Sequence, residues 1–375
     1  MKVIRHIHPI GQGAFYSEKI MEGDRNIANV VYDCGSELKQ SISEKGEILI
    51  NTVFKKKDVI DILFISHFDL DHVNGIVKLY ERVKHIQYVV MPLLSSREKD
   101  YYITIYEAFD KTGNLIKIFK DTKTFFKNSH IIYINPSNDI GEATRNITFL
   151  ENLDYNENNE TYLDSYKVIS LKTMGEWIYI PYNYQSNDVC EQFEDLLISK
   201  GFSQKNFLTG KISSKQVRDI YIEIEKDVNN TSLLVYSGPC VNNNQNRNFL
   251  CFNYLPINRV CGLTSGCLYT GDACFKKEKG KELIELTKTR LNPYIKELGI
   301  VQIPHHGSKH SYSSELVKIN NNCNFYFLSY GDGNSYGHPH DSVIEDIIQN
   351  MKIVFCVNQY SSTSLTEYCY FLDKN

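Results

Sequence analysis

Four side chains that can bind a metal ion lie within six residues of one another, directly after a run of apolar residues. They are His67, Asp69, Asp71 and His72, and the run before them spans residues 59–65. Such a run predicts a buried strand that ends in a loop, where side chains can converge on an ion without disturbing a sheet. Imidazole nitrogens and carboxylate oxygens are ligands for zinc, manganese or iron, and the oxygen-rich mixture favours the harder ions.

The same pattern, an apolar strand that ends in histidine or aspartate, returns three times in the last third of the chain. These strands, with the polar residues after them, are 267–270 with Asp272, 300–303 with Pro304-His-His-Gly-Ser308, and 323–329 with His338 and His340. Chance scatter seldom places polar residues so consistently at strand ends. We therefore expect the four strand ends to contribute to one site.

Composition narrows the class of protein. The chain has 375 residues, 42% of them hydrophobic and 23% charged, which is typical of a globular protein with a sizeable core. No apolar run approaches the roughly 18 residues of a transmembrane helix, and no secretory apolar core follows the N-terminus. Its ten cysteines form no CxxC pair, so neither a disulfide framework nor a cysteine-based zinc site is expected. We expect a cytoplasmic protein with no membrane partner.

Charge says little about the substrate. The net charge of −4 gives no global attraction to nucleic acid. It does not exclude a phosphodiester substrate, because a bound dication is often the largest local charge in a site.

The coarse pattern is that of an α/β protein. Apolar alternation and glycine punctuation in the first third predict antiparallel strands. Helices are expected over residues 74–83 and 278–298, the first of them directly after the metal-binding loop.

Residues 95–228 are the part of the chain whose role the sequence does not decide. Helices are expected at 97–109, 189–199 and 217–227. We expect a single domain, residues 1–375, in which residues 95–228 form an insertion or cap-like region; ordinary scaffold is the alternative.

The order of the motifs HFDLDH, GDA, PHHGS and YGHPH resembles the metallo-β-lactamase superfamily. Within it, the pattern is similar to the hydrolase domain of ComEC-type competence proteins, whose N-terminal signatures resemble Gly11-Gln-Gly13 and Asp33-Cys-Gly35. The resemblance implies an αββα four-layer sandwich with the motif loops along one edge. It also implies a stand-alone hydrolase, because the membrane channel of competence proteins is absent from the sequence.

The resemblance further implies a ligand set for two ions, Zn²⁺ or Mn²⁺. Carried over to this sequence, His67 and Asp69 serve the first ion, Asp71 and His72 the second, and Asp272 bridges them. Asp69 stands where the superfamily usually has histidine, and its harder oxygen makes Mn²⁺ as plausible as Zn²⁺.

One departure leaves the number of ions open. Typical members have a further histidine before the bridging aspartate, and only His130 occupies that interval, without a matching context. ComEC-like relatives often have an Asn-x-Ser pattern there, which residues 229–234 resemble.

The adjacent His305 and His306 are expected to play different roles. Successive residues of an extended chain point opposite ways, so one imidazole would face the metal. We favour His306 as the ligand and His305 as a contact to substrate. Ser308 and Lys309 are candidates to hydrogen-bond a phosphate, with ordinary surface residues as the equal alternative.

The histidines of the last motif are expected at the rim. His338 is the stronger candidate, as a ligand or a phosphate-binding residue, and His340 is a weaker substrate-binding candidate that can also begin a helix. His6 and His8 are expected to be ordinary strand histidines.

These residues predict a metal-dependent hydrolase, with a phosphodiesterase or nuclease as the leading hypothesis. In the expected mechanism a metal-bound hydroxide attacks, Asp71 or Asp69 accepts the proton, and His338 neutralises charge on the phosphate. The substrate would be DNA, RNA or a small nucleotide, and the lack of a basic groove favours a small or single-stranded one.

Two alternatives stay open. The first is a hydrolase of a non-phosphate ester or amide, since one fold hosts many chemistries. The second is a non-catalytic, metal-stabilised subunit of a larger complex, with residues 95–228 as a docking surface for a protein partner. The sequence does not predict an oligomeric state.

Overall fold

The protein is described here by a computed structural model. It describes residues 1–37, 42–109, 113, 115–136, 146–184, 195–196, 198–201, 213, 215–217, 219–220, 232–240, 247–252, 255–257 and 264–371.

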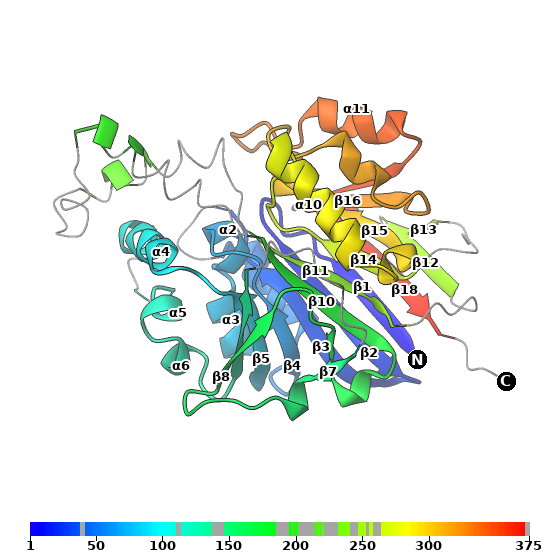
Figure 1. The fold of residues 1–375 in the computed structure, drawn as a ribbon, viewed down its shortest axis with the longest axis horizontal. Coiled ribbons are helices and arrows are strands. Elements are labelled where there is room, and N and C mark those ends of the chain that lie inside the picture. Colours follow the sequence, from blue (N-terminus) through cyan, green and yellow to red (C-terminus); the bar gives the residue numbers. More distant parts are fainter. Residues whose placement is uncertain are drawn as a thin grey trace.

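Two β-sheets form the body of the described part of the chain (Figure 1). The first has ten strands in the order β13-β12-β18-β1-β2-β3-β4-β5-β6-β8. Its strands are β1 (Lys2–Ile7), β2 (Phe15–Glu22), β3 (Arg25–Cys34), β4 (Val59–Phe64), β5 (His85–Pro92), β6 (His130–Asn135), β8 (Glu160–Asp164), β12 (Arg247–Phe252), β13 (Leu255–Ile257) and β18 (Leu365–Tyr370). The strands from β3 to β8 in this order pair in parallel.

The second sheet has eight strands in the order β17-β16-β15-β14-β11-β10-β9-β7. They are β7 (Thr148–Phe149), β9 (Ile169–Ser170), β10 (Trp177–Tyr184), β11 (Ser232–Pro239), β14 (Gly266–Tyr269), β15 (Leu298–Gln302), β16 (Phe325–Ser329) and β17 (Ile353–Val357). The four strands from β14 to β17 are parallel to one another. Both sheets therefore contain a parallel block whose carboxyl ends can carry a site.

Helices cover the outer face of each sheet, as Figure 1 shows. They are α1 (Glu44–Val53), α2 (Leu70–Val73), α3 (Ile76–Arg82), α4 (Ser96–Phe109), α5 (Lys117–Lys120) and α6 (Thr122–Phe125) beside the first sheet, and α10 (Lys277–Arg290) and α11 (Asp341–Gln349) beside the second. Short 3₁₀ turns lie at Leu150–Asn152, Lys172–Met174, Tyr294–Glu297, His305–Gly307, Ser314–Lys318 and Ser361–Thr363.

Three buried apolar clusters separate these layers. One lies between the first sheet and its helices, one between the two sheets, and one between the second sheet and α10 and α11. The strand β4, which is apolar except for Asp61, is buried on both faces: Leu63 packs toward the helices and its neighbour Phe64 packs between the sheets. A strand that is buried on both faces needs apolar side chains on both. The expected αββα sandwich is confirmed.

A buried cluster of charges links the two sheets. Arg5 of β1 forms ion pairs with Glu18 and Glu367, both in the first sheet. The carboxylate of Glu18 also accepts hydrogen bonds from Tyr179 and Tyr269 of the second sheet, at 2.8 and 3.0 Å. Buried charges are tolerated where they are paired and hydrogen-bonded, as these are.

The expected elements around the metal-binding loop are present. A short helix, α2, and then α3 follow residues 59–65, and β1, β2 and β3 pair antiparallel as expected. The helix expected over 278–298 ends earlier, at Arg290. Pro293, which has no N–H to donate and disfavours a helical residue before it, explains the early end.

Residues 95–228 contribute to both sheets. The helix expected at 97–109 is α4, and the region also contains β6 and β8 of the first sheet and β7, β9 and β10 of the second. These strands are part of the two sheets, and the role of residues 95–228 as an insertion or cap-like region stays a prediction. The helices expected at 189–199 and 217–227 lie largely outside the described residues. None of the described helices has the length and apolar character required to span a membrane.

Candidate metal centre

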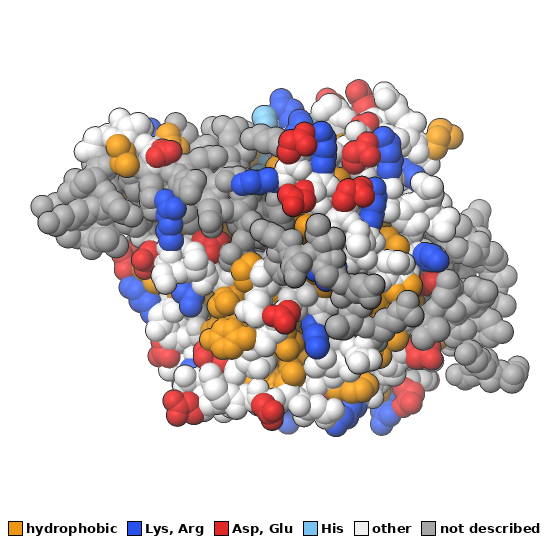
Figure 2. Space-filling view, viewed as in Figure 1, with side chains coloured by type: hydrophobic (Ala, Val, Ile, Leu, Met, Phe, Trp, Pro, Cys, Tyr) orange, Lys and Arg blue, Asp and Glu red, His pale blue; other side chains and the backbone are white. Residues whose placement is uncertain are grey.

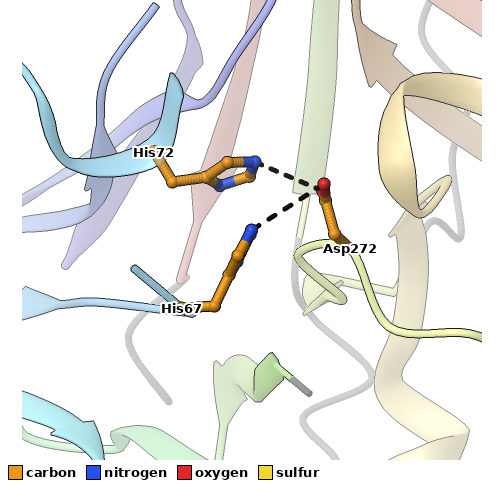
Figure 3. Close-up of side chains that lie close together, drawn as sticks. All are labelled: His67, His72 and Asp272. Atoms are coloured by element: carbon orange, nitrogen blue, oxygen red, sulfur yellow. Dashed lines mark ion pairs between the residues drawn. The ribbon is translucent and has the colours of Figure 1, made fainter. Parts of the chain in front are cut away.

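The residues singled out in the sequence come together at the carboxyl ends of the parallel strands. His67 follows β4, Asp272 follows β14, and His305 and His306 follow β15. Asp71 and His72 lie in the first turn of α2, which begins at Leu70. Figure 3 shows the imidazoles of His67 and His72, which follow β4 of the first sheet, pointing toward the carboxylate of Asp272, which follows β14 of the second.

Asp272 lies at the centre of the cluster. Its Oδ1 is 3.2 Å from His72 Nε2, and its Oδ2 is 3.8 Å from both His67 Nε2 and His306 Nε2. On the far side, His306 Nε2 is 3.1 Å from Asp71 Oδ2.

Two sets of three ligand atoms are compact enough to hold an ion. One set is His67, His72 and Asp272, the other is Asp71, His72 and His306, and within each set the atoms lie within 4.8 Å of one another. The two sets share His72. Asp69 lies beside the first set, with its Oδ2 3.3 Å from His67 Nε2.

The unpaired atoms of the cluster test whether a cation fits. His67 Nε2, His72 Nε2, Asp71 Oδ1 and Asp272 Oδ1 are buried and have no hydrogen-bond partner among the described residues. Buried polar atoms without partners are costly and rare, so four in one cluster need a compensating group. Nitrogen and carboxylate oxygen donors suit a divalent cation, and the residues therefore fit the metal that the sequence implied.

Hydrogen bonds behind the histidines orient their Nε2 atoms inward. His72 Nδ1 is 2.8 Å from Asp33 Oδ2, and His306 Nδ1 is 2.8 Å from the backbone oxygen of Ser329. Both partners can only accept, so each Nδ1 carries a proton, and each Nε2 is the nitrogen turned toward the cluster. This arrangement, a carboxylate or carbonyl behind a ligating imidazole, is typical of metal sites.

Ser66 orients the imidazole of His67 in the same way. Its hydroxyl donates to Asp33 Oδ2 at 2.6 Å and lies 2.8 Å from His67 Nδ1. Because the hydroxyl proton of Ser66 is donated to Asp33, His67 Nδ1 must donate to Ser66 Oγ. The Nε2 of His67 is therefore again the nitrogen turned toward the cluster. Asp33 thus orients two histidines at once.

The carboxylates of the cluster are held ionised by the surrounding histidines. Burial alone would raise the pKa of Asp272, but His72, His306 and His305 outweigh it and hold that pKa well below its ordinary value. Burial likewise opposes ionisation of Asp71, whose pKa is lowered by His72 and His306. Ionised carboxylates are the form that binds a cation.

The expectation that His305 and His306 point opposite ways is wrong. Both residues have positive φ, 48° and 54°, in a 3₁₀ turn, so the chain is not extended there. His305 Nε2 lies 3.9 Å from Asp272 Oδ2, almost as near as His306 Nε2. Both imidazoles therefore face the cluster, and His306 alone belongs to a compact ligand set of the described residues.

The structure brings His338 to the site as well. Its ring lies 5.3 Å from that of His305, it is buried, and its Nδ1 makes no hydrogen bond to the described residues. Burial first, and then His305 and His306, lower the pKa of His338, so the imidazole is neutral. His340 is the N-cap residue of α11, which agrees with the expectation that it can begin a helix.

Ser308 and Lys309 are less closely involved. The hydroxyl of Ser308 is buried and accepts a hydrogen bond from the backbone N–H of His310 at 3.2 Å. Lys309 is exposed, and its backbone N–H lies 3.3 Å from His340 Nδ1. Their role as phosphate contacts stays a prediction.

Two sequence features, His130 and the run 229–234 that resembles Asn-x-Ser, left the number of ions open, and they lie in different places. His130, at the start of β6, stacks on Tyr88 and packs at a tilt against Tyr155, with ring centroids 5.5 and 4.3 Å away. Ser232, from the run resembling Asn-x-Ser, lies at the cluster: its hydroxyl accepts from Asp272 N at 3.0 Å. Residues 229–231 lie outside the described residues.

Sequence reasoning missed the residues that orient the ligands. Asp33 was noted only as part of a resemblance, and Ser66, Gln302 and Ser329 were not noted. Gln302 Oε1 accepts from the backbone N–H groups of Thr270 and Gly271, at 3.0 and 3.2 Å, and so holds the loop that carries Asp272. Asp33 could have been found, because it too follows an apolar strand.

Comparison with known proteins agrees with this site. A family model described as "Metallo-beta-lactamase superfamily" matches residues 26–143, which contain nearly all of β3, the strands β4 to β6 and the first motif. Members of this superfamily are mostly metal-dependent hydrolases that bind a divalent metal, often zinc. No curated protein matches the chain. The narrower resemblance to ComEC-type proteins stays a prediction.

Proposed function

We propose that the protein is a metal-dependent phosphodiesterase, a nuclease or nucleotide hydrolase. The observation that carries the proposal is the position of Asp272, whose two oxygens lie within 4 Å of His67, His72 and His306. One carboxylate among histidines of both ligand sets is the arrangement that a pair of bridged cations requires.

The proposed ligands are the six residues expected from the sequence. They are His67, Asp69, Asp71, His72, Asp272 and His306, and they would hold Zn²⁺ or Mn²⁺. When bound, such ions lower the pKa of a water toward neutrality and offset the negative charge of a phosphate.

The chain's own groups would move the proton and bind the phosphate. Asp71 is the proposed proton acceptor, because its Oδ1 is buried and makes no hydrogen bond to the described residues, while its Oδ2 contacts His306. His338 is proposed to donate a hydrogen bond to a phosphate oxygen, since its Nδ1 also lacks a partner among these residues. His305, Ser308, Lys309 and His340 remain candidate contacts to substrate.

Surface charge supports a small or single-stranded substrate. Figure 2 shows Lys and Arg side chains interspersed with Asp and Glu over α10 and α11, with no single basic stripe on that face. Ion pairs such as Lys281–Glu278 neutralise the local lysines. Duplex binding usually depends on many unpaired cations along one surface.

The proposal also includes a cytoplasmic location. The cysteines of the described residues all have free thiols, which suits a reducing compartment.

A panel of substrates tests the proposal. Protein loaded with Zn²⁺ or Mn²⁺ is incubated with single-stranded DNA, RNA, bis-nitrophenyl phosphate and a β-lactam, and its metal content is measured. We expect hydrolysis of phosphodiesters that is lost in the double variant Asp71→Ala, His72→Ala. Hydrolysis of the β-lactam alone would support the ester or amide alternative. Bound metal without any hydrolysis would support a non-catalytic subunit that docks a partner through residues 95–228.

A further inference from the structure

A cavity of about 520 Å³ lies between loops at the same end of the sheets as the metal centre. One wall comes from the loop after β1 and from the start of α1, and the other from the loops after β16 and β17. The size falls within the range of about 300–1,000 Å³ that small-molecule sites occupy. The metal-centre histidines are not among its lining residues, so the cavity is a separate space.

Contacts on both walls connect the cavity to the metal centre. On one wall, Gln12 is followed by Gly13, where a Cβ atom would lie only 2.4 Å from the backbone oxygen of Asp71. On the other wall, the ring of Tyr336 stacks on His338 with centroids 5.7 Å apart. Residues that line the cavity, or that directly follow a lining residue, therefore contact two residues of the proposed reaction, Asp71 and His338.

Gln12 offers a fixed hydrogen-bond donor in the cavity. The residue is 7% exposed, and its Oε1 accepts from the backbone N–H of Gly331 at 3.1 Å. That contact sets the orientation of the amide, and its Nε2 makes no hydrogen bond to the described residues. An amide NH₂ group that is not used by the described residues can donate a hydrogen bond to a ligand in the cavity.

The charges around the cavity disfavour a phosphate chain. Three carboxylates, those of Glu37, Glu44 and Asp332, line it against one ammonium group, that of Lys45. Flanking phosphates of a polymer would be repelled by this balance. Hydroxyl and amino groups, which donate to carboxylates, would be favoured.

We infer that this cavity binds the base and sugar of a small nucleotide whose phosphodiester lies at the metal centre. Gln12 donates a hydrogen bond to the base, Tyr336 supplies an aromatic wall beside it, and the carboxylates accept from sugar hydroxyls or base amino groups. The inference rests on the proposed function, which it narrows from nucleic acids in general to small nucleotides.

Nucleoside binding tests the cavity without the metal reaction. Protein treated with a chelator is titrated by calorimetry and by ligand-observed NMR with adenosine, guanosine, cytidine and uridine to about 10 mM, which covers millimolar dissociation constants. We expect at least one nucleoside to bind at one site per chain. If none binds, the inference is overturned.

Two variants assign the binding to this cavity. Tyr336→Ala should weaken it by about 5- to 150-fold, the effect of losing a base–aromatic contact, while Tyr336→Phe should bind like the wild type. Gln12→Glu keeps an oxygen for Gly331 N–H but replaces the donor, and should weaken binding roughly 2- to 13-fold or more. Gln349→Glu, on the exposed face of α11, is the matched control. Unchanged binding in both Tyr336→Ala and Gln12→Glu would overturn the inference.

Activity measurements separate this inference from the proposed function. Hydrolysis of bis-nitrophenyl phosphate without any nucleoside binding would support the proposed phosphodiesterase and overturn the inference that the cavity binds a nucleoside. Nucleoside binding that depends on Tyr336 and Gln12, without hydrolysis of any phosphodiester, would support the binding cavity and contradict the proposed phosphodiesterase. With metal-loaded protein, a dinucleotide should be cleaved faster than long single-stranded DNA. The opposite order would overturn the preference for small nucleotides.

Discussion

The carboxylate of Asp33 and the imidazole of His72 form a fully buried pair, with Asp33 Oδ2 2.8 Å from His72 Nδ1. The same oxygen accepts the hydroxyl proton of Ser66, which in turn contacts His67. Asp33 therefore determines which nitrogen of two proposed ligands faces the centre. A carboxylate in this position also raises the basicity of the imidazole toward a cation.

Asp33→Asn should weaken metal binding by about 10- to 100-fold without unfolding the protein, the usual effect of losing such a partner. Asparagine is the suitable replacement because residue 33 has a φ of 55°, a conformation that asparagine tolerates. Competition with a chromophoric chelator measures the affinity, and circular dichroism checks the fold. Asp61→Asn is the matched control, since Asp61 accepts from Asn29 N–H and not from a histidine. Equal metal affinity in Asp33→Asn and the wild type would contradict the assigned role.

Gln302→Leu should lower both stability and metal affinity. The substitution leaves the buried N–H groups of Thr270 and Gly271 without their acceptor, at a cost of about 1–3 kcal/mol in the free energy of unfolding. Since these residues precede Asp272, its carboxylate should lose its position. Urea unfolding measures the first effect and chelator competition the second. Gln87→Leu, half-buried on β5, is the control and should leave metal affinity unchanged. A stable Gln302→Leu protein with normal affinity would show that Gln302 does not position Asp272.

Arg5→Met should destabilise the fold by about 3–5 kcal/mol, because it leaves the buried carboxylates of Glu18 and Glu367 without a counter-charge. The side chains of Arg5, Glu18 and Glu367 are 0%, 2% and 3% exposed. Arg25→Met is the matched control: the Arg25–Glu22 pair is 73% and 67% exposed, and screening by water should make its loss undetectable. Denaturant unfolding of both variants makes the comparison. Equal stability of the two variants would contradict the importance of the buried pairs.

Acid should destabilise the protein partly through two strand histidines. Burial, and then Lys19, lower the pKa of His6 from 6.5 to about 4, and burial lowers the pKa of His8 well below 6.5. In the unfolded chain both histidines therefore take up protons near pH 6.5, whereas in the folded chain they stay neutral there. Their contribution to stability is complete above pH 6.5 and is lost as the pH falls toward 4.

His8→Gln should reduce this acid sensitivity, by at most about 1.4 kcal/mol per pH unit for one proton. Glutamine can keep a neutral hydrogen bond to Ser17, which now lies 2.7 Å from His8 Nε2. Free energies of unfolding at pH 5, 6 and 7 measure the slope. Identical slopes for variant and wild type would show that His8 takes up protons equally in the folded and the unfolded chain.

Local pattern was enough to predict the strands and the candidate residues of the site, and the resemblance of the motifs implied the sandwich. Apolar runs such as 59–65 identify strands, and a histidine or aspartate directly after a strand is visible without any tertiary information. The limit appears at His305 and His306. Alternation along an extended chain predicted opposite orientations, but the backbone N–H of His305 donates to Gly271 O at 3.2 Å, and the turn that results directs both rings inward.

The orienting residues could not be predicted for a related reason. Serine and glutamine are common in loops, and nothing local distinguishes Ser66 or Gln302 from other polar residues. Their importance lies in partners from other strands, such as Asp33 for Ser66 and Thr270 for Gln302.

The sequence by itself determined the types of ligand, their order and their places at strand ends, because ligand chemistry and side-chain periodicity are local properties. Only the tertiary structure decided which nitrogen faces the centre, which carboxylate lies behind it, and where a ligand cavity forms. Gln12 shows the reason: its partner Gly331 is 319 residues away in the chain, and only the packing of two sheets brings them together.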